Sequence, residues 1–357
     1  MHLLKEAGVA GKTVFLRADL DVPLVKGKVN DDTRLQSAIP TIEYLLKQGA
    51  KIIIGGHLGR PEEIDKSLSL EPIAKWFKKM LKQVQHDMNK TRRGEFEGWE
   101  IGPNIFLLEN LRFYKGEETN NPEFSKKLAS LADIYVNDAF AICHREHASI
   151  VGITRFLPHF AGFHLEKEVE VLTEVLKNPK RPLTVVIGGA KLETKLPLVE
   201  KMHKIADYIL VGGKLAQEVK TLFKLQQEKI IGRKSALLTA DLNEDETDIT
   251  EKSIENFLQI IGLAKTVIWN GPLGKVSGSK KELVKSEEGS KKLAEGLVKS
   301  SAYLIVGGGD TVGFLDKVCL LDHFACMPKT RCFLSTGGGA MLSLLSGEKL
   351  PGVEVLS

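Results

Sequence analysis

The stretch Thr184-Val-Val-Ile-Gly-Gly-Ala-Lys-Leu-Glu-Thr-Lys195 decides the fold class of this chain. Its first four residues are mostly β-branched and predict a buried strand, which ends at the pair Gly188-Gly189. A helical pattern of apolar residues follows, at Leu192, Leu196, Val199 and Met202. A strand, a glycine turn and a helix in this order form the repeating unit of a parallel α/β sheet.

This turn is also suited to bind an anion. Glycines let backbone N–H groups approach a phosphate closely, and the start of a helix adds a partial positive charge. Lys191 and Lys195 stand one helical turn apart at this point. The spacing is neither that of a P-loop nor G-x-G-x-x-G. Taken alone, the stretch is equally consistent with an ordinary strand–helix turn that carries solvated lysines.

The same pattern recurs through the second half of the chain, which strengthens the first interpretation. Each predicted strand ends in glycines at its carboxyl end, where open α/β sheets bind their ligands. The five strand ends are Val185–Ile187 before Gly188-Gly189, Tyr208–Val211 before Gly212-Gly213, Val267–Trp269 before Asn270–Gly274, Tyr303–Val306 before Gly307–Thr311, and Phe333-Leu334 before Ser335–Gly339.

In the first half, predicted strands alternate with predicted helices, but cationic side chains take the place of the glycines. The strands are expected at Val14–Arg17, Lys51–Ile54, Ile105–Leu108 and Ile134–Val136, with helices over residues 35–46, 69–81 and 122–131. Five arginines and two histidines occur at strand ends or helix starts, with two aspartates beside them: Arg17, Arg34, Arg60, Arg112, Arg145, His57, His144, Asp19 and Asp21. We expect these side chains to form a basket for a small, multiply charged acid.

Length and composition predict two domains of ordinary soluble type. The chain has 357 residues, of which 43% are hydrophobic and 27% charged, and this length exceeds one typical core. The second domain is expected after a helix over Leu165–Leu176 that precedes Pro179 and Pro182. Residues 82–99 are polar, basic and aperiodic, and we interpret them as a solvated loop rather than a polyanion-binding segment.

The charge balance and the cysteines exclude several classes of protein. A net charge of +4 gives no general case for nucleic-acid binding, so any anion site must be a local cluster. The four cysteines lack C-x-x-C spacing and are expected to be free thiols in a reducing compartment. No apolar run of about 18 residues is present, and the amino-terminal residues do not read as a signal peptide. We therefore expect a cytoplasmic protein without nucleic-acid or membrane partners.

An arginine basket in one domain and glycine loops with lysines in the other indicate phosphoryl transfer. Here the chain resembles phosphoglycerate kinase over nearly its whole length. The motifs that carry the resemblance are Arg17–Pro23, Asp32–Arg34, His57–Pro61, Glu109–Tyr114, Val136–Phe140, His144–Ser149, Gly188–Lys191 with Lys195, Trp269–Gly274, Val306–Thr311, Ser335–Ala340 and Leu350–Val353.

The resemblance implies two Rossmann-like domains, each a parallel sheet flanked by helices, joined by a connector helix with a cleft between them. Residues 1–163 and a returning tail, 347–357, would bind phosphoglycerate, residues 164–178 would be the connector, and residues 179–346 would bind nucleotide. The implied reaction is reversible phosphoryl transfer between 1,3-bisphosphoglycerate and ADP, giving 3-phosphoglycerate and ATP. Nothing in the sequence demands more than a monomer.

The resemblance also implies a set of site residues. Phosphoglycerate would be held by Asp19, Asp21, Arg34, His57, Leu58, Gly59, Arg60, Arg112 and Arg145. Nucleotide would be held by Lys191, Lys195, Gly212, Gly213, Asn270, Pro272, Gly274, Ser277, Gly308, Gly309, Asp310 and Thr311. Asp310 would lie nearest a Mg²⁺ ion carried mainly by the nucleotide phosphates, and Arg34, Lys191, Lys195 and Gly338 would act on the transferring group.

The chain departs from the family pattern at four places. Asp21 stands where asparagine is usual, and Ala141-Ile142 stands where the family has Gly-Thr. Lys275-Val-Ser277 replaces the usual Val-Phe-Glu, and the segment between Gly213 and Val267 is short. The last two departures bear on nucleotide affinity and on the choice between ATP and GTP.

Three other functions remain open from the residues alone. One is a non-catalytic descendant that binds phosphorylated metabolites or nucleotide. Another is a dinucleotide-dependent oxidoreductase, which would need a G-x-G-x-x-G turn with a downstream acid. The third is polyanion binding through Lys78–Arg93, whose signature would be a steep dependence on salt.

Overall fold

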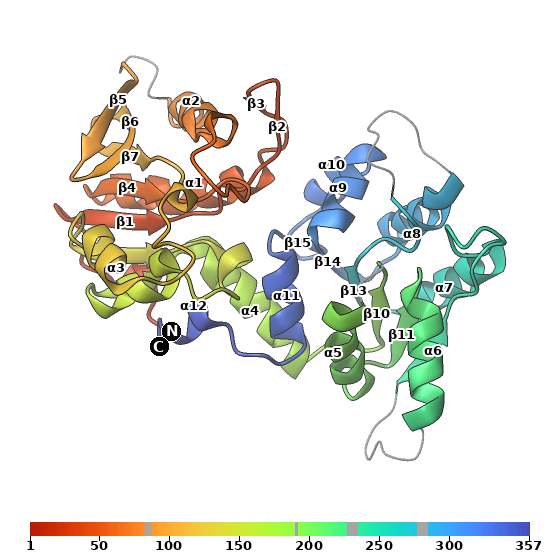
Figure 1. The fold of residues 1–357 in the computed structure, drawn as a ribbon. Coiled ribbons are helices and arrows are strands. Elements are labelled where there is room, and N and C mark those ends of the chain that lie inside the picture. The colour runs from red at the N-terminus through yellow and green to blue at the C-terminus, as the bar shows by residue number, and fades with distance from the viewer. Residues whose placement is uncertain (83–86, 190–191, 227–234, 277–284) are drawn as a thin grey trace. The chain divides into compact units, whose positions relative to one another are not determined.

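The computed structural model describes residues 1–82, 87–189, 192–226, 235–276 and 285–357. The chain divides into two compact units (Figure 1). The first unit is Met1–Glu170 with Lys349–Ser357, and the second is Val171–Glu348. The division falls inside helix α4, Phe163–Lys177, which covers nearly the same residues as the helix expected between the domains.

The first unit is built on a seven-stranded sheet. Its parallel strands are β1 (Thr13–Arg17), β4 (Lys51–Gly55), β7 (Ile105–Leu108), β8 (Ile134–Asn137) and β9 (His159–Ala161). They lie in the order β7-β4-β1-β8-β9, so the strand order reverses between β1 and β8. Helices α1 (Thr33–Lys47), α2 (Glu71–Met80) and α3 (Pro122–Ala129) connect them. The predicted alternation of strand and helix is therefore confirmed.

An antiparallel hairpin extends this sheet beyond β7. It consists of β5 (Asn89–Arg93) and β6 (Phe96–Gly102), so the prediction of a loop over 82–99 was wrong. Every residue of β5 is exposed, which removes the hydrophobic alternation that identifies a strand in a sequence. The basic residues of β5 form ion pairs with β6, including Lys90 with Glu97 at 2.8 Å. A charged edge of this kind also discourages pairing with another chain.

Short elements complete the first unit. A hairpin of β2 (Leu24–Val25) and β3 (Lys28–Val29) precedes α1. Among the described residues of this unit, six short helical turns connect the larger elements: η1 (Leu4–Glu6), η2 (Lys66–Leu68), η3 (Leu111–Phe113), η4 (Phe140–Ile142), η5 (Ala148–Gly152) and η6 (Ile153–Arg155).

The carboxyl-terminal segment Lys349–Ser357 belongs to the first unit. Its helix α12 spans Pro351–Glu354. The Gly352 N–H donates to the carbonyl of Cys143 at 2.9 Å, and Asn137 Nδ2 donates to the Gly352 carbonyl at 3.1 Å. The His2 N–H donates to the carbonyl of Leu356 at 2.7 Å. These bonds anchor the tail beside the end of β8.

The second unit is built on a six-stranded, fully parallel sheet. Its strands are β10 (Leu183–Ile187), β11 (Tyr208–Val211), β12 (Ala236–Thr239), β13 (Thr266–Asn270), β14 (Tyr303–Gly307) and β15 (Cys332–Ser335). The order β12-β11-β10-β13-β14-β15 is the usual dinucleotide-fold order, and it reverses between β10 and β13. The helices are α5 (Leu192–His203), α6 (Leu215–Gln226), α7 (Glu251–Leu263), η7 (Lys285–Glu287), α8 (Glu288–Lys299), α9 (Gly309–Lys317), α10 (Leu321–Ala325) and α11 (Gly338–Leu345).

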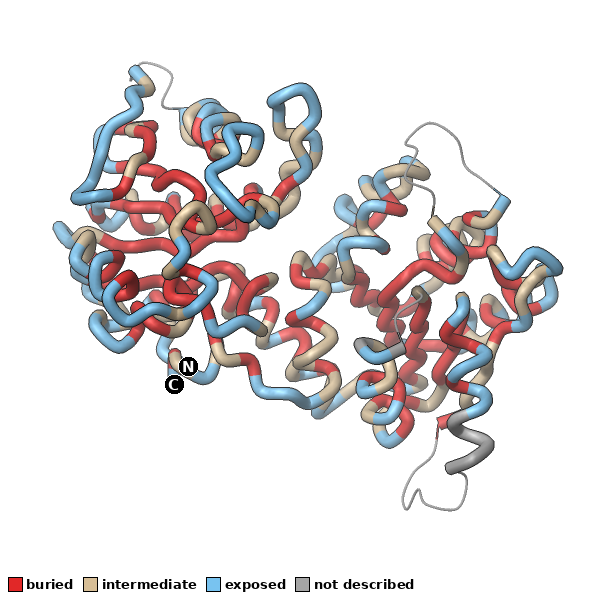
Figure 2. The backbone as a smooth tube through the Cα atoms, in the orientation of Figure 1, coloured by how far each residue is buried: buried red, intermediate tan, exposed pale blue. Residues whose placement is uncertain are grey.

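Each sheet forms the centre of its own hydrophobic core. Strands β7, β8, β10 and β13 are buried at every position. Figure 2 shows this burial concentrated along the strands of each unit. Such strands are covered on both faces, which is why they read as continuous apolar runs in the sequence. Within the described residues, no helix has the length and apolar character needed to cross a membrane.

Candidate functional site

Arg17 ends β1 but does not line a basket, which corrects the expectation for this residue. Its side chain is completely buried and bonded inside the first unit. The Nε–H donates to Ser149 Oγ at 2.8 Å, Nη1 donates to the Ala18 carbonyl at 2.6 Å, and Nη2 lies 3.0 Å from His57 Nδ1. Arg17 therefore holds Ser149, the Ala18 carbonyl and His57 in place from inside the core.

The loop after β4 presents His57, Leu58, Gly59 and Arg60. Gly59 has a φ of +66°, and a Cβ there would lie 2.8 Å from Leu68 Cδ2, so the turn requires glycine. The side chain of Asn110 holds this loop through the backbone of Leu58, accepting from its N–H and donating to its carbonyl at 2.8 Å. Asn110 thereby ties the loop after β4 to the loop after β7.

Arg34 and Asp21 face each other beside this loop. Arg34 lies in the first turn of α1, where its Nη1 donates to the Asp21 carbonyl at 2.6 Å and lies 3.7 Å from Asp21 Oδ2. Asp21 Oδ1 accepts from the Gly59 N–H at 2.9 Å. Asp19 is buried and accepts from the Ala141 N–H at 3.0 Å. The predicted Asp19, Asp21, Arg34 and Gly59 are thus brought together.

The other three predicted arginines differ in exposure. Arg112 follows β7, donates from Nη1 to the Gly59 carbonyl at 2.6 Å, and pairs with Glu118 at 3.0 Å. Arg60 and Arg145 are exposed. Arg112 therefore joins the cluster around Gly59 through a direct contact, whereas Arg60 lies in the same loop with its side chain in solvent.

Burial and positive charge control the titratable groups here. The pKa of His57 is held well below its usual range by burial, reinforced by Arg17 and Arg112. The same causes lower the pKa of His147 to about 3. Burial raises the pKa of Asp19, and Arg34 opposes that rise. The cluster consequently offers neutral imidazoles and cationic guanidinium groups, a suitable set for binding an anion.

In the second unit, the glycine loops pack backbone against backbone at the carboxyl ends of the strands. A Cβ on Gly188 would lie 2.1 Å from the Pro272 carbonyl oxygen, and one on Gly271 would lie 2.3 Å from that of Gly188. A Cβ on Gly213 would likewise lie 3.0 Å from the Gly189 carbonyl oxygen. Only glycine permits this approach. The loops after β10, β11 and β13 therefore form one continuous backbone surface.

A second contact of this kind joins the loops after β14 and β15. A Cβ on Gly338 would lie 2.9 Å from Gly308 Cα. Gly338 begins α11, so its free backbone N–H groups are directed to the carboxyl edge of the sheet. Gly309 is exposed in the first turn of α9.

Lys195 lies across the point where the strand order reverses. It belongs to α5, which follows β10, and its Nζ donates to Asn270 Oδ1 at the end of β13. Burial lowers the pKa of Lys195 to about 8, although the carboxylate of Asp310 opposes the shift. Asn270 is buried. The structure thus brings together Lys195 of α5, Asn270 at the end of β13 and Asp310 at the start of α9.

Thr311 and Asp310 follow β14 and differ in environment. The Thr311 side chain is fully buried, and its Oγ1 accepts from the Gly271 N–H at 2.7 Å. Thr311 therefore fixes one glycine loop against another. Asp310 is exposed at the start of α9. Among the described residues, no group of three His, Cys, Asp or Glu side chains could hold a metal ion. One exposed carboxylate suits an ion that arrives with phosphate ligands.

The remaining predicted nucleotide residues have mixed outcomes. Gly212 and Gly213 follow β11, and a Cβ on Gly212 would lie 2.6 Å from Leu273 Cδ2. Pro272 is buried and Gly274 is half-buried in the loop after β13. Lys191 and Ser277 lie outside the described residues.

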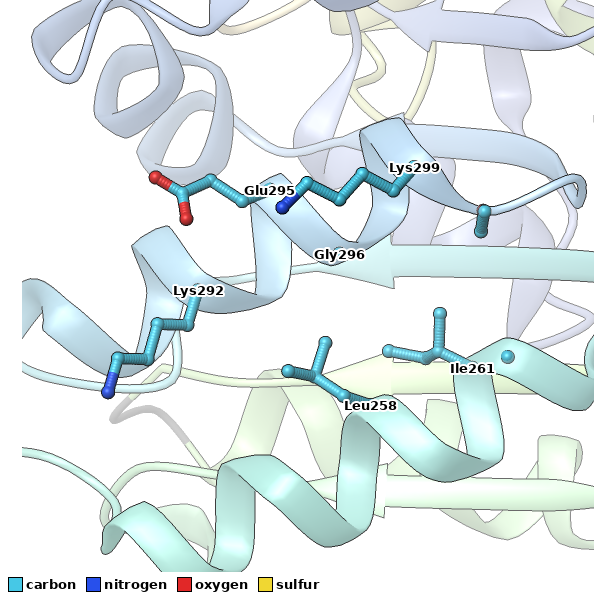
Figure 3. Close-up of a pocket in the computed structure, with 8 residues that line it drawn as sticks. Leu258, Ile261, Lys292, Glu295, Gly296 and Lys299 are labelled. Atoms are coloured by element: carbon cyan, nitrogen blue, oxygen red, sulfur yellow. The ribbon is translucent and has the colours of Figure 1, made fainter.

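Two cavities lie away from these strand ends. One, of about 370 Å³, is lined by Leu258 and Ile261 of α7 and by Gly296 and Lys299 of α8 (Figure 3). The other, of about 330 Å³, includes Thr13, Lys51 and Ile105 at the starts of β1, β4 and β7. The carboxyl ends of α7 and α8 lead into the starts of β13 and β14. Both cavities therefore belong to amino-terminal edges and are separate from the clusters described above.

Comparison with known proteins decides the family. The sequence model described as phosphoglycerate kinase matches residues 4–244 and 233–348. The chain belongs to the phosphoglycerate kinase family. A phosphoglycerate kinase of Dictyoglomus turgidum is 36% identical over 398 residues, covering 99% of this chain and 97% of that protein.

Solved phosphoglycerate kinase structures share the fold. The structure from Coxiella burnetii has a TM-score of 0.79 at 32% identity and covers 100% of this chain and 99% of that one. The structure from Pyrococcus horikoshii OT3 has a TM-score of 0.77 at 29% identity and covers 100% and 98% of the two chains. The predicted fold of two parallel α/β domains is confirmed.

The activity of a phosphoglycerate kinase follows from this membership. It is a glycolytic enzyme that transfers a phosphoryl group reversibly between 1,3-bisphosphoglycerate and ADP, giving 3-phosphoglycerate and ATP. The prediction of a phosphotransferase is therefore confirmed.

The sequence did not indicate several residues that support the first cluster. Glu117 and Ser149 are fully buried and hydrogen-bonded beneath Arg17, and Asn110 joins two loops. All three lie inside or within a few residues of the phosphoglycerate kinase motifs quoted above. That proximity was the only available signal, because their partners are far away in the sequence.

Proposed function

We propose that the first unit binds the phosphoglycerate of this kinase reaction and that the second unit binds Mg²⁺ with ADP or ATP. The phosphoglycerate ligands would be Asp19, Asp21, Arg34, His57, Leu58, Gly59, Arg60, Arg112 and Arg145. The nucleotide ligands would be Lys191, Lys195, Gly212, Gly213, Asn270, Pro272, Gly274, Ser277, Gly308, Gly309, Asp310 and Thr311.

The roles of these residues follow from the charge on the reacting groups. In the direction that consumes 3-phosphoglycerate, the nucleophile is a carboxylate that is already ionised at neutral pH, so the reaction needs no general base. Catalysis then depends on positioning and on neutralising the phosphoryl oxygens. We assign this neutralisation to Arg34, Lys191 and Lys195, with the N–H groups at Gly338 as additional donors.

One observation carries the nucleotide assignment. The hydrogen bond from Lys195 to Asn270 joins α5, which follows β10, to the end of β13, and these two strands flank the reversal of strand order. Ligands of open parallel sheets bind at this reversal. A partly buried ammonium group there has few water partners, so an incoming phosphate would gain a strong, charge-assisted hydrogen bond.

Magnesium would be held mainly by the nucleotide phosphates, with Asp310 as its protein carboxylate. Mg²⁺ retains several waters and usually takes one or two carboxylates together with substrate phosphates. When bound, the ion would neutralise phosphate charge. The exposure of Asp310 and its interaction with Lys195 support this assignment. We further propose a cytoplasmic monomer without nucleic-acid or membrane partners.

A coupled assay tests the proposal. The enzyme would receive 3-phosphoglycerate and Mg-ATP, with a dehydrogenase that reduces the product in excess. Lys195→Ala and Arg34→Ala should lower kcat by about 10²-fold or more, since each removes a charge from the transferring group. Lys204→Ala and Arg155→Ala are matched controls because both side chains are exposed. Full activity in Lys195→Ala would refute its assigned role.

A further inference from the structure

His57 receives a hydrogen bond from a group that can only donate. Its Nδ1 lies 3.0 Å from Arg17 Nη2, and both side chains are buried. Arginine has five N–H donors and no acceptor, and it stays protonated in proteins. A contact of this length therefore requires Nδ1 to be the acceptor. The proton of a neutral His57 must then lie on Nε2.

The surroundings of His57 oppose a second proton. The largest electrostatic influences on His57 come from Arg17 of β1, Arg112 of η3, His147 just before η5 and Arg34 of α1. None of these groups carries a negative charge that would stabilise an imidazolium. Burial disfavours the cation further.

The opposite ring nitrogen retains access to solvent. His57 Nε2 forms no hydrogen bond with any described residue, and it is not among the fully buried polar atoms that lack a partner. A residual 5% exposure of His57 therefore includes this atom. Nε2–H is consequently free to donate to an anion bound beside Arg34 and Gly59.

Arg17 is itself held in place by a directed chain of hydrogen bonds. Its Nε–H donates to Ser149 Oγ at 2.8 Å, and that hydroxyl donates to Glu117 Oε1 at 2.6 Å. The Ser149 N–H donates to Glu117 Oε2 at 3.0 Å. Because the hydroxyl has one proton and gives it to Glu117, its lone pairs remain for Arg17.

Charge balance explains why these hydrogen-bonded groups are stable within the core. Glu117 and Arg17 are both fully buried, and Ser149 bridges their opposite charges. Burial raises the pKa of Glu117, while Arg17 and the two bonds from Ser149 lower it. Buried charges are tolerated when they are paired and hydrogen-bonded in this way.

We propose that Arg17, held by Glu117 through Ser149, is a positioning residue that fixes His57 as a neutral imidazole with its proton on Nε2. The site then offers phosphoglycerate one directed hydrogen-bond donor whose charge is constant across physiological pH. Only the identity of the bound anion rests on the proposed function. The state of His57 is a property of the protein without substrate.

Nuclear magnetic resonance of the substrate-free protein tests this state directly. The chain has nine histidines, and the protein would carry ¹⁵N in their rings. His57→Gln identifies the His57 signals by their loss. At pH 7 we expect a non-protonated Nδ1 and a protonated Nε2, with no titration of His57 between pH 5.5 and 8. A proton on Nδ1, or a titration in that range, would overturn the proposal.

Arg17→Met tests the role of the arginine. Without the donor, we expect both neutral tautomers of His57 and a titration closer to the ordinary pKa. Calorimetry would measure the affinity for 3-phosphoglycerate in Arg17→Met and in the unaltered protein. The ratio of the first affinity to the second should rise about fivefold between pH 8 and pH 5.5, because a charged donor binds an anion more tightly than a neutral one. An unchanged tautomer in Arg17→Met would overturn the proposal.

A second variant covers the chance that Arg17→Met alone does not fold. Arg17→Met with Glu117→Gln removes both buried charges together, which avoids leaving Glu117 unbalanced. The same spectra and the same affinity ratio are expected. If His57 shows the expected tautomer but 3-phosphoglycerate does not bind, the proposed function fails and this inference stands.

Discussion

The guanidinium of Arg34 lies 3.7 Å from the carboxylate of Asp21, while its Nη1 donates to the Asp21 carbonyl at 2.6 Å. The carboxylate therefore offsets part of the charge that Arg34 would otherwise direct at a bound anion. Asp21 also accepts from the Gly59 N–H at 2.9 Å. A substitution at Asp21 can remove the negative charge and keep the hydrogen bond with the Gly59 N–H.

We expect Asp21→Asn to bind 3-phosphoglycerate more tightly than the unaltered enzyme. Asparagine keeps an oxygen for the Gly59 N–H but removes the negative charge. The positive charge of Arg34 is then no longer offset by a neighbouring carboxylate when an anion binds. Both side chains are partly exposed, which limits the effect to about two- to fivefold in KM. The coupled assay measures it at low ionic strength. Glu63→Gln removes an equal charge from an exposed residue and should leave KM unchanged.

The lowered pKa of Lys195 predicts a loss of nucleotide affinity at alkaline pH. Its pKa is lowered to about 8, so the free enzyme loses the ammonium charge as the pH rises through 8. We expect the affinity for ADP to fall roughly three- to tenfold between pH 7.5 and 9.5. Calorimetric titration at each pH measures the change. Lys195→Arg stays protonated and should bind with a flat profile, and matching profiles in the two proteins would contradict this prediction.

Gly188 and Gly313 should respond in opposite ways to alanine. In Gly188→Ala, the new Cβ would meet the Pro272 carbonyl oxygen at 2.1 Å, so the backbone must move. We expect a loss of about 1–3 kcal/mol in the free energy of unfolding and weaker nucleotide binding. Gly313 lies inside α9 with open space around it, and alanine there should stabilise by about 0.5–1 kcal/mol. Urea unfolding measures both.

The buried ion pair between Glu287 and Lys317 should be sensitive to the loss of either partner. Lys317 Nζ donates to both carboxylate oxygens of Glu287 at 2.7 Å, and both side chains are nearly inaccessible to solvent. Lys317→Met leaves the carboxylate buried without this counter-ion and should cost about 3–5 kcal/mol of stability. Lys317→Met with Glu287→Leu should recover most of that loss in the same urea experiment.

An exposed pair is the control for this effect. Lys292 contacts Glu251 at 2.5 Å, but both side chains are well exposed. Lys292→Met should leave the urea midpoint unchanged, because solvent screens surface pairs. Equal losses of stability in Lys292→Met and Lys317→Met would show that burial does not explain the contribution of the Lys317–Glu287 pair.

The strands and the residues at their carboxyl ends were largely predictable. Val185–Ile187 and Ile105–Leu108 are continuous apolar runs because parallel strands are covered on both faces. Gly188 and Gly189, which follow the first of these strands, are a local signal of close approach to the backbone, and a Cβ on Gly188 would lie 2.1 Å from the Pro272 carbonyl oxygen. Strand β12, Ala236–Thr239, escaped prediction because it is a short edge strand with only partial burial.

The hairpin over β5 and β6 shows where local pattern fails. Residues Asn89–Arg93 are all exposed, so their strand conformation comes from pairing with β6 and not from their own hydrophobicity. The ion pairs of Lys90 and Arg92 with Glu97 become visible only when the two strands are in register. Pairing partners of this kind are set by the fold as a whole.

The sequence by itself determined which residues stand at the carboxyl ends of the strands, because strand periodicity, glycine turns and cationic side chains are local properties. Only the tertiary structure decided which of those side chains are buried and which stay accessible to solvent. Arg17 and Arg34 belong to the same predicted set of cationic residues, yet Arg17 is buried against Ser149, 132 positions away, while Arg34 stays partly exposed beside Asp21. The physical reason is that burial and charge pairing depend on neighbours in space, which a local pattern does not specify.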